Sequence, residues 1–347
     1  MPLRPFVENI LVLGQSNLAN AVTAEMRKRR RYRILDLMEP GEPGRVFKDG
    51  VPFVGSLDRG LRTIPRTHRI VVALSERRGR LPIEALLDAK RQGIVIEDAV
   101  HLYERLTGKL ALDQLQPSHL IFAPELGRRS LHTVLLRLFS VILAAVGLIS
   151  CAPLFAVIAV LIKWDSPGPV FFLHDRIGKD GRKFSLVKFR TMDSVLPSSS
   201  EWVRDNGHRI TSVGRWLRKY RLDELPQLFN VLLGHMNLIG PRPHPASNYY
   251  LFMRNIPFYA FRATVRPGIT GWAQVRYGYA NDLQEEIEKM RYDMYYIKYH
   301  SFRLDVEIIL RTIAVIIVGS ESPRVGSASN EPLSDKAGSP LDEQSAA

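Results

Sequence analysis

Two adjacent carboxylates, Asp223 and Glu224, are the residues of this sequence that best suit chemistry by type and setting. Pro226 follows them and fits the first turn of a helix, where a missing N–H costs little, so the pair is predicted at a helix start. Free N–H groups there attract anions, phosphate included. Since successive helix residues do not share a face, we expect one carboxylate to be a nucleophile and the other to bind a divalent cation.

A basic segment, Arg215 to Arg221, comes directly before the pair and holds four cations in seven residues. Cations beside a carboxylate pair favour a negatively charged substrate, and Arg215 is a candidate to contact it. The plainer interpretation is a solvated helix terminus whose charges match those of its neighbours. Short motifs are weak signals alone, so this segment leaves both interpretations open.

Two strands are predicted at 170–177 and 183–190, joined by a hairpin turn at Lys179-Asp180-Gly181. Side chains alternate along a strand, so Lys188 and Arg190 share one face. Two cations that project together can hold a phosphate. The alternative is a solvated strand face.

Two rigid loops offer further groups that could bind substrate. Arg242 stands among the prolines of 241–245, and a fixed loop that presents one guanidinium suits bidentate phosphate binding. The glycine-rich segment 266–275 contributes Arg266 and Gln274, which are within reach of the same substrate. A purely structural role for Arg242 is the alternative.

The segment Leu138 to Ile162 has 25 residues without a charge, which is long enough to span a bilayer. Ser150 and Pro153 lie near its middle, and a proline there removes a helix hydrogen bond and kinks the helix. Cations flank both ends, and positive flanks favour the cytoplasmic face. We therefore expect a re-entrant helix–break–helix over 128–165 with its hinge at Ser150 and Pro153. A single transmembrane helix is the alternative.

The residues before 128 indicate a separate α/β domain. Buried strands are predicted at 9–14, 32–37 and 69–74, with helical segments between them. The first turn reads Gly14-x-Ser16-x-x-Ala19, where a dinucleotide-binding domain has three glycines. We expect a Rossmann-like domain without a catalytic cofactor, retained for assembly or regulation. A nucleotide or nucleotide-sugar sensor is the alternative.

Composition limits the class of protein. The 347 residues are 46% hydrophobic and 24% charged, which suits about two folded domains with additional segments. The formal charge of +13 implies an anionic partner. The single cysteine, Cys151, excludes an internal disulfide framework and fits a reducing compartment.

Two helical segments follow the loops, one at 285–299 rich in Tyr, Met and Lys, and a strongly apolar one at 304–318. Both suit a membrane interface, with amphipathic core helices as the alternative. The predicted fold class is α/β, with a Rossmann-like domain over 1–127, the membrane segment over 128–165 and a mainly helical α+β domain over 166–319 on the membrane surface. A serine-rich loop is predicted over 196–205 and a disordered tail over 320–347.

Several motifs, in order, resemble the bacterial sugar transferase family, the monotopic polyprenyl-phosphate phosphoglycosyl transferases of the exopolysaccharide-initiating type. The likeness covers about residues 130 to 319. The motifs are Lys163-Trp164-Asp165-Ser166-Pro167-Gly168-Pro169-Val170-Phe171-Phe172, Val187-Lys188-Phe189-Arg190-Thr191-Met192, the segment 222–228, Gly240-Pro241-Arg242-Pro243 and the segment 267–275.

The resemblance implies a two-step reaction at the cytoplasmic face of the bacterial inner membrane. Asp223 would attack the β-phosphate of a UDP-sugar and release UMP, and undecaprenyl phosphate would then take the phosphosugar from Asp223. Glu224 would bind Mg²⁺, and the neighbouring cations would stabilise the remaining negative charge. The resemblance implies no nucleic acid partner and is compatible with a homodimer. The cations in question are Lys188, Arg190, Arg215 and Arg242.

Two other classes of protein fit the sequence less well. A nucleotide-dependent oxidoreductase would need an intact glycine fingerprint and a hydride-acceptor site, and the sequence shows neither. A basic membrane scaffold or nucleic-acid binder would explain the charge of +13 but not the ordered motifs. The sequence does not separate glucose, galactose or an N-acetylated sugar as the transferred group.

Overall fold

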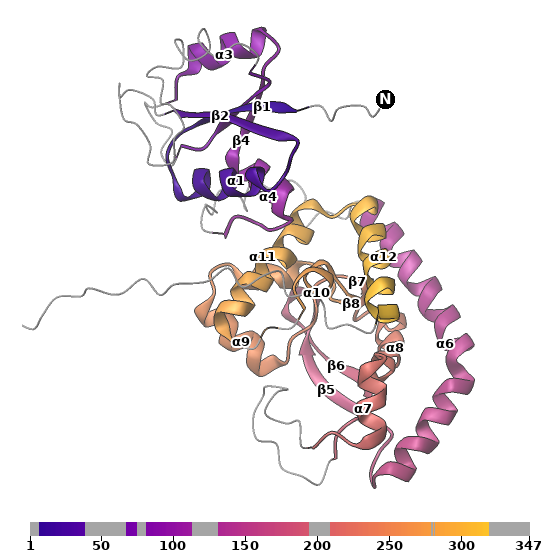
Figure 1. Cartoon of the computed structure of the whole chain (residues 1–347). Coiled ribbons are helices and arrows are strands. Elements are labelled where there is room, and N and C mark those ends of the chain that lie inside the picture. Colours follow the sequence, from indigo (N-terminus) through magenta and orange to yellow (C-terminus); the bar gives the residue numbers. More distant parts are fainter. Residues whose placement is uncertain are drawn as a thin grey trace, which may run out of the picture.

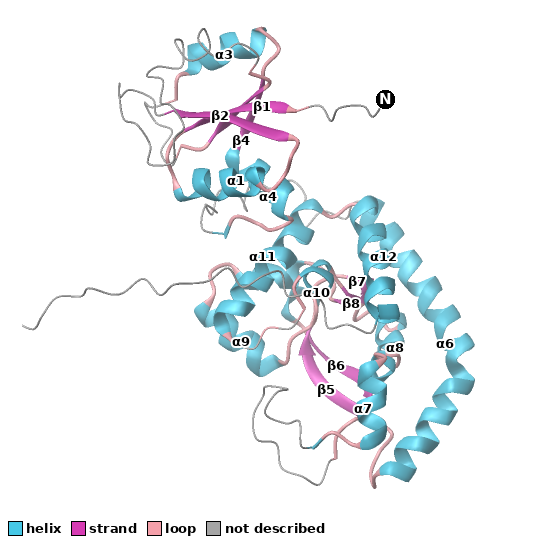
Figure 2. Cartoon of the chain, viewed as in Figure 1, coloured by secondary structure: helices cyan, strands magenta, loops and turns pink. Residues whose placement is uncertain are grey.

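The computed structural model describes residues 7–38, 67–74, 81–112, 131–193, 209–278, 280 and 282–318. Figure 1 shows a small unit built on a sheet at the N-terminal end and a larger unit formed by the later residues. Helices and strands occur in both units (Figure 2), so the prediction that the chain mixes α-helices and β-strands is confirmed. The predicted loop at 196–205 and the predicted tail at 320–347 lie outside the described residues.

Within the described residues, four parallel strands form the N-terminal sheet in the order β2-β1-β3-β4. Four residues of β1, Ile10 to Leu13, are buried because helices cover both faces of the sheet. Helices α1 and α4 pack on one face and α3 packs on the other. The elements are β1 (Glu8–Leu13), α1 (Asn17–Arg27), β2 (Tyr32–Met38), β3 (Arg69–Val72), α3 (Ile83–Arg91), β4 (Val95–Asp98) and α4 (Ala99–Thr107).

The turn after β1 is closed by its own residues. Gly14 has a φ of +111°, and a Cβ there would lie 2.9 Å from backbone atoms of Ala73, so only glycine fits. The Ser16 hydroxyl donates to the Ala73 carbonyl (2.8 Å) and accepts from the Ala19 N–H (3.0 Å). This hydroxyl therefore caps α1 at the position where a dinucleotide-binding domain holds a phosphate.

The larger unit contains an antiparallel hairpin, β5–β6, and a short parallel pair, β7–β8, set among helices. The hairpin turns at Asp180 and Gly181, which both have positive φ, as the sequence predicted for this turn. The elements are α6 (Leu131–Asp165), β5 (Phe171–Ile177), η2 (Lys179–Gly181), β6 (Lys183–Phe189), α7 (Ser212–Lys219), η4 (Leu222–Glu224), α8 (Gln227–Leu232), β7 (Asn237–Ile239), α9 (Ala246–Asn255), η5 (Tyr259–Thr264), β8 (Gly268–Thr270), α10 (Trp272–Arg276), α11 (Leu283–Tyr299) and α12 (Phe302–Val318).

Helix α6 runs without interruption from Leu131 to Asp165, with Pro153 inside it. The predicted helix–break–helix with its break at Ser150 and Pro153 is therefore wrong, since one continuous helix passes through both residues. The helix curves along the side of the larger unit (Figure 1). Proline removes one hydrogen bond, which bends a helix and need not end it. By length and composition α6 is long and apolar enough to cross a membrane, with a mean hydropathy of 2.6 over an 18-residue stretch.

One face of α6 packs on the larger unit and the other is exposed. Ala144 and Ile158 are fully buried, and the Ser140 hydroxyl accepts the Leu238 N–H (3.1 Å). On the opposite side Val146 and Ile149 are more than half exposed. Such a long exposed apolar face is typical of contact with lipid or with another protein.

The two units touch where α4 meets α11. Glu104 of α4 is buried, and its carboxylate accepts hydrogen bonds from the Lys298 ammonium (2.8 Å) and the Tyr299 hydroxyl (2.6 Å). The Leu110 N–H donates to the Arg291 carbonyl (2.9 Å). The N-terminal unit is therefore joined to the larger one by buried polar contacts as well as by the chain.

Candidate active site

The two adjacent carboxylates lie in η4, a single 3-10 turn ahead of α8. Arg221 begins the turn with a left-handed backbone (φ +57°), and α8 starts only after Pro226. The prediction that the pair occupies the first turn of that helix is therefore wrong by one turn. The N–H groups of Glu224 and Leu225 donate to carbonyls within the turn (3.3 and 3.2 Å), so these two do not face a ligand.

Glu224 is held by two cations from other elements. Arg242 donates to both of its carboxylate oxygens (2.6 and 3.2 Å), and the Lys188 ammonium donates to one of them (3.0 Å). Burial by itself would raise the pKa of this carboxyl, but Arg242 and Lys188 outweigh it and hold the pKa well below its usual range. Glu224 is thus a fixed anion that orients two cations.

Asp223 has a different environment. Its side chain is buried, and burial raises the pKa of its carboxyl despite the opposing charge of Lys188. In the described part of the chain, no group donates a hydrogen bond to this carboxylate. The two neighbours therefore have pKa values moved in opposite directions, which is typical of paired carboxylates with separate tasks.

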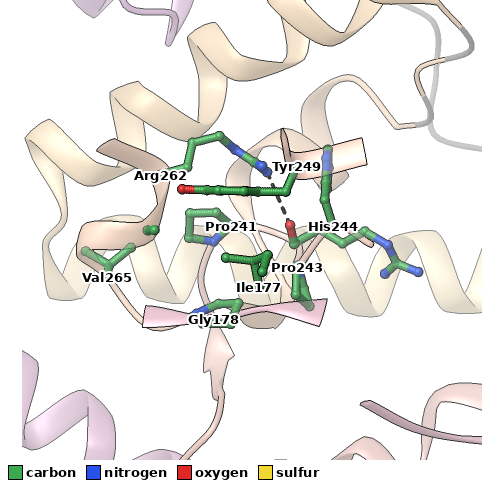
Figure 3. A pocket seen from close by; sticks show the side chains of 11 residues that line it. Ile177, Gly178, Pro241, Pro243, His244, Tyr249, Arg262 and Val265 are labelled. Carbon is green, nitrogen blue, oxygen red and sulfur yellow. Dashed lines mark hydrogen bonds between the residues drawn. The ribbon is translucent and has the colours of Figure 1, made fainter. Parts of the chain in front are cut away.

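The two cations are themselves positioned. Burial lowers the pKa of Lys188, an effect that the charge of Glu224 opposes. The Arg242 carbonyl accepts a hydrogen bond from Arg262 (3.2 Å), drawn as a dashed line in Figure 3. Arg262 is buried and donates twice to Asp293 (2.6 and 3.0 Å). The buried ion pair of Arg262 and Asp293 therefore fixes the loop that presents Arg242.

A pocket lies on the side of this loop where Arg262 sits (Figure 3). Apolar groups form much of its wall, and Arg242, His244, Tyr249 and Arg262 contribute polar side chains. Burial lowers the pKa of His244 well below the usual range, and the nearby charge of Arg262 acts in the same direction. The lining residues are Ile177, Gly178, Pro241, Arg242, Pro243, His244, Tyr249, Arg262, Ala263, Val265 and Pro267.

Arg190 does not join Lys188. It is buried just beyond the end of β6 and donates to the carbonyls of Ser166 (2.6 Å) and Pro167 (2.6 Å) after α6. The prediction that the two cations share one phosphate-binding face is corrected, because the strand ends at Phe189 and the Arg190 side chain finds its acceptors after α6. In this structure Arg190 fixes the residues that follow the C-terminal end of α6.

Replacing Arg190 with methionine is expected to lower the free energy of unfolding by about 2–4 kcal/mol, since it removes the donor to the buried Ser166 carbonyl and to the Pro167 carbonyl. Chemical denaturation in detergent measures this change. Lys183→Met is the matched control, because Lys183 is an exposed cation on the same strand. Equal stability of the two variants would contradict the anchoring role of Arg190.

The other predicted binding residues lie apart from Glu224. Arg215 is exposed on α7. Arg266 donates to the Gly234 carbonyl (3.0 Å) after α8, and the Gln274 amide donates to the Ile269 carbonyl (2.9 Å). The two hydrogen bonds of Arg266 and Gln274 are structural, and substrate binding by all three residues stays a prediction from the sequence.

Arg218 is the cation of α7 that sequence reasoning missed. Its guanidinium donates to the Thr191 hydroxyl (2.9 Å), and its charge lowers the pKa of Asp223, which burial raises. Helical spacing places Arg218 on the same face as Gly214, four residues earlier, but only the structure shows that this face packs inward.

A metal site is not preformed around Glu224. Among the described residues, no group of three or more His, Cys, Asp or Glu side chains could hold a metal ion. Both Glu224 oxygens already accept hydrogen bonds from cations, and Mg²⁺ prefers free oxygen ligands. The residues as arranged do not fit the predicted Mg²⁺ at Glu224.

A family model for bacterial sugar transferases matches residues 131–319. The UDP-N-acetylgalactosamine-undecaprenyl-phosphate N-acetylgalactosaminephosphotransferase of Aeromonas hydrophila is 43% identical over 217 residues, which are 62% of this chain and 51% of that protein. A UDP-glucose:undecaprenyl-phosphate glucose-1-phosphate transferase of Xanthomonas campestris pv. campestris is 43% identical over 185 residues, 52% of this chain and 38% of that protein. The exopolysaccharide production protein PSS of Rhizobium leguminosarum bv. phaseoli is 38% identical over 187 residues, 52% of this chain and 94% of that protein. The chain thus spans about half or less of the length of the first two relatives.

Proposed function

Because the chain belongs to the bacterial sugar transferase family, we propose that it transfers a sugar-1-phosphate from a UDP-sugar to undecaprenyl phosphate. Two of the relatives carry this activity in their names. The observation that supports it most is the pair at η4, where Glu224 is fixed by Lys188 and Arg242 while Asp223 is not hydrogen-bonded within the described residues. A third relative is named for exopolysaccharide production, which makes polymer initiation the proposed role.

In the proposed mechanism Asp223 is the nucleophile. Its carboxylate oxygen bonds to the β-phosphorus of the UDP-sugar, the bond from that phosphorus to the bridging oxygen breaks, and UMP leaves with the electron pair. In the second step an oxygen of undecaprenyl phosphate attacks the same phosphorus and releases Asp223. Carboxylates are competent nucleophiles once the charge of the phosphate is neutralised.

The cations around Glu224 are proposed to supply that neutralisation. Lys188 and Arg242 approach from β6 and from the Gly240–Arg242 loop, and Glu224 keeps both side chains in place before substrate arrives. Arg218 acts from the Asp223 side, where its charge already favours the ionised carboxylate. Fixed charges of this kind stabilise a phosphoryl transition state without reorganising during the reaction.

A magnesium requirement stays a prediction from the family resemblance. Glu224 would have to give up a hydrogen bond to contribute an oxygen, so the metal would depend largely on oxygens of the diphosphate. Initial rates measured against Mg²⁺ after chelation test the requirement. Full activity in excess chelator would remove it.

We propose that the enzyme works at the cytoplasmic face of the bacterial inner membrane, with α6 embedded and both units on the cytoplasmic side. The exposed apolar face of α6 supports embedding. The N-terminal strand order β2-β1-β3-β4 is compatible with a Rossmann-like domain. We propose that this domain serves in assembly or regulation, and that the assembly is a homodimer.

Pro153→Leu is expected to straighten α6 and convert a re-entrant segment into a full span, because it restores the lost helix bond. Accessibility of single cysteines placed at the two ends of α6, in a Cys151→Ser background, reports the topology. Ala152→Leu is the matched control, since it adds the same apolar bulk and keeps the proline. Both ends remaining on the cytoplasmic side in Pro153→Leu would contradict a hinge at Pro153.

The proposed function is tested with purified protein in detergent, Mg²⁺, undecaprenyl phosphate and a panel of UDP-sugars. Release of UMP from one donor is the expected result and identifies the sugar at the same time. Release of UDP would mean an ordinary glycosyl transfer and would refute the role of Asp223. No product with any donor would count against the transferase activity itself.

A further inference from the structure

The last residues of the N-terminal unit contact the glycine-rich loop of the larger unit directly. The buried Trp272 indole N–H donates to the Gly108 carbonyl (2.8 Å), and Arg276 donates to the Thr107 carbonyl (3.3 Å). Gly108 has a φ of +70°, and a Cβ there would lie 2.9 Å from the Trp272 ring. The fit between Gly108 and Trp272 therefore leaves no room for another residue type at 108.

Trp272 is in turn tied to the loop that presents Arg242. It directly follows Gly271, whose Cβ would lie only 2.1 Å from the Gly240 carbonyl oxygen. The Gly240 N–H also donates to the Thr270 carbonyl (2.9 Å). This close packing and the hydrogen bond couple the two backbones, so a displacement of Trp272 is expected to shift Gly240 and then Arg242, two residues further along.

A second set of contacts links the N-terminal unit to the loop that presents Arg242, through Leu110 and the core of the larger unit. Leu110 is buried in the cluster that contains Tyr259 and Met290. The Tyr259 hydroxyl accepts a hydrogen bond from Arg262 (2.7 Å), and Arg262 holds the Arg242 carbonyl. Leu110 thus belongs to the same core cluster as Tyr259, which is hydrogen-bonded to the arginine of the ion pair.

We infer that the segment 108–110 of the N-terminal unit is part of the framework that places the Arg242 guanidinium on Glu224. Gly108 and Trp272 are positioning residues in this arrangement, acting through the Gly240–Arg242 backbone. The N-terminal unit then has a task in the reaction that its lack of a glycine fingerprint does not suggest. The kinetic consequence rests on the proposed function, and the structural one does not.

Hydrogen exchange of backbone amides in the full-length protein tests the structural part. Trp272→Phe keeps an aromatic ring but removes the donor to Gly108, and Gly108→Ala inserts a methyl group against the ring. In both variants the amides of 237–242 and 268–271 are expected to exchange roughly tenfold faster or more, as local opening becomes easier. Trp272→Phe is the milder change and keeps the test decisive if Gly108→Ala fails to fold.

Leu86→Ala is the matched control. Leu86 lies on α3 and is buried against the face of the N-terminal sheet opposite α4. This variant loosens the same unit without touching 108–110, so exchange in the loop is expected to stay at the wild-type rate. Unchanged exchange in Trp272→Phe, or equal acceleration in Leu86→Ala, would overturn the inference.

Steady-state kinetics, at a temperature well below the unfolding transition of every variant, separates positioning from simple destabilisation. Trp272→Phe is expected to lower kcat by roughly tenfold or more with little change in KM, because Arg242 acts mainly in the transition state. Leu86→Ala should keep the wild-type kcat. An unchanged kcat in Trp272→Phe would refute the catalytic consequence. If the wild-type protein transfers nothing, the proposed function fails, and the exchange result still decides the positioning.

Discussion

Asp223→Asn is expected to abolish sugar-1-phosphate transfer, lowering the rate by roughly 10⁴-fold or more, the scale on which loss of a covalent nucleophile acts. The amide has almost the same shape but cannot form the bond to phosphorus. The carboxylate of Asp223 accepts no hydrogen bond within the described residues, so the fold loses little. UMP release and mass spectrometry of the trapped phosphosugar adduct measure the two consequences.

The thermal transition of Asp223→Asn should stay at or above that of the wild-type protein. Burial raises the pKa of Asp223, which means that burial destabilises the ionised carboxylate. A neutral amide removes this destabilisation. Asp175→Asn is a control for the amide change, because this carboxylate on β5 is exposed. Retention of an adduct in Asp223→Asn would assign the nucleophile to another residue.

Glu224→Gln is expected to lower both stability and rate. Removing this charge takes from the partly buried Lys188 and Arg242 the carboxylate to which both are hydrogen-bonded, and breaking a buried ion pair in this way costs about 3–5 kcal/mol. The rate should fall by roughly 10²-fold or more because both cations lose their positions. Denaturation in detergent and initial rates, including a titration with Mg²⁺, measure these effects.

The matched control for this prediction is Glu307→Gln. Glu307 pairs with Arg311 (2.8 Å), and both side chains are about two-fifths exposed, so the control should change stability by less than about 1 kcal/mol. If Glu224→Gln were as mild as Glu307→Gln, the buried cations would have to be held by other groups. If its response to Mg²⁺ were unchanged while the rate fell, Glu224 would position cations and not bind metal.

The sequence was sufficient to predict the carboxylate pair and two of its cations. Asp223 and Glu224 stand next to each other in a basic segment, and Lys188 and Arg242 lie in elements with strong local signals, a strand and a proline-rich loop. The family is confirmed by the model that matches 131–319. Local sequence signals do not indicate the direction in which each long side chain points.

Arg190 and Arg215 show why direction could not be predicted. The alternation rule places Arg190 beside Lys188 only if the strand continues, and the strand ends one residue earlier. Helical spacing alone does not indicate which side of α7 packs inward, so the sequence does not distinguish the exposed Arg215 from Arg218. Both errors come from tertiary packing, which decides where the guanidinium finds its acceptors.

The ion pair beneath the Arg242 loop had no sequence signal of its own. Arg262 and Asp293 are 31 residues apart in different elements. On α11, the polar residues Glu286, Lys289 and Asp293 recur at spacings of three and four, which resembles a solvated face. In the structure all three are buried, because η5 and the Arg242 loop cover that face.

The contact between α4 and α11 decides where this protein can be divided. Leu110 and Glu104 lie upstream of Leu131, where the family match begins, yet Leu110 belongs to the core of the larger unit. A truncated fragment starting at 131 would expose the Lys298 and Tyr299 side chains and leave a hole beside Tyr259. A chimera that carries this N-terminal unit on another transferase would need Trp272, Lys298 and Tyr299 as well, so the two halves form one module for protein engineering.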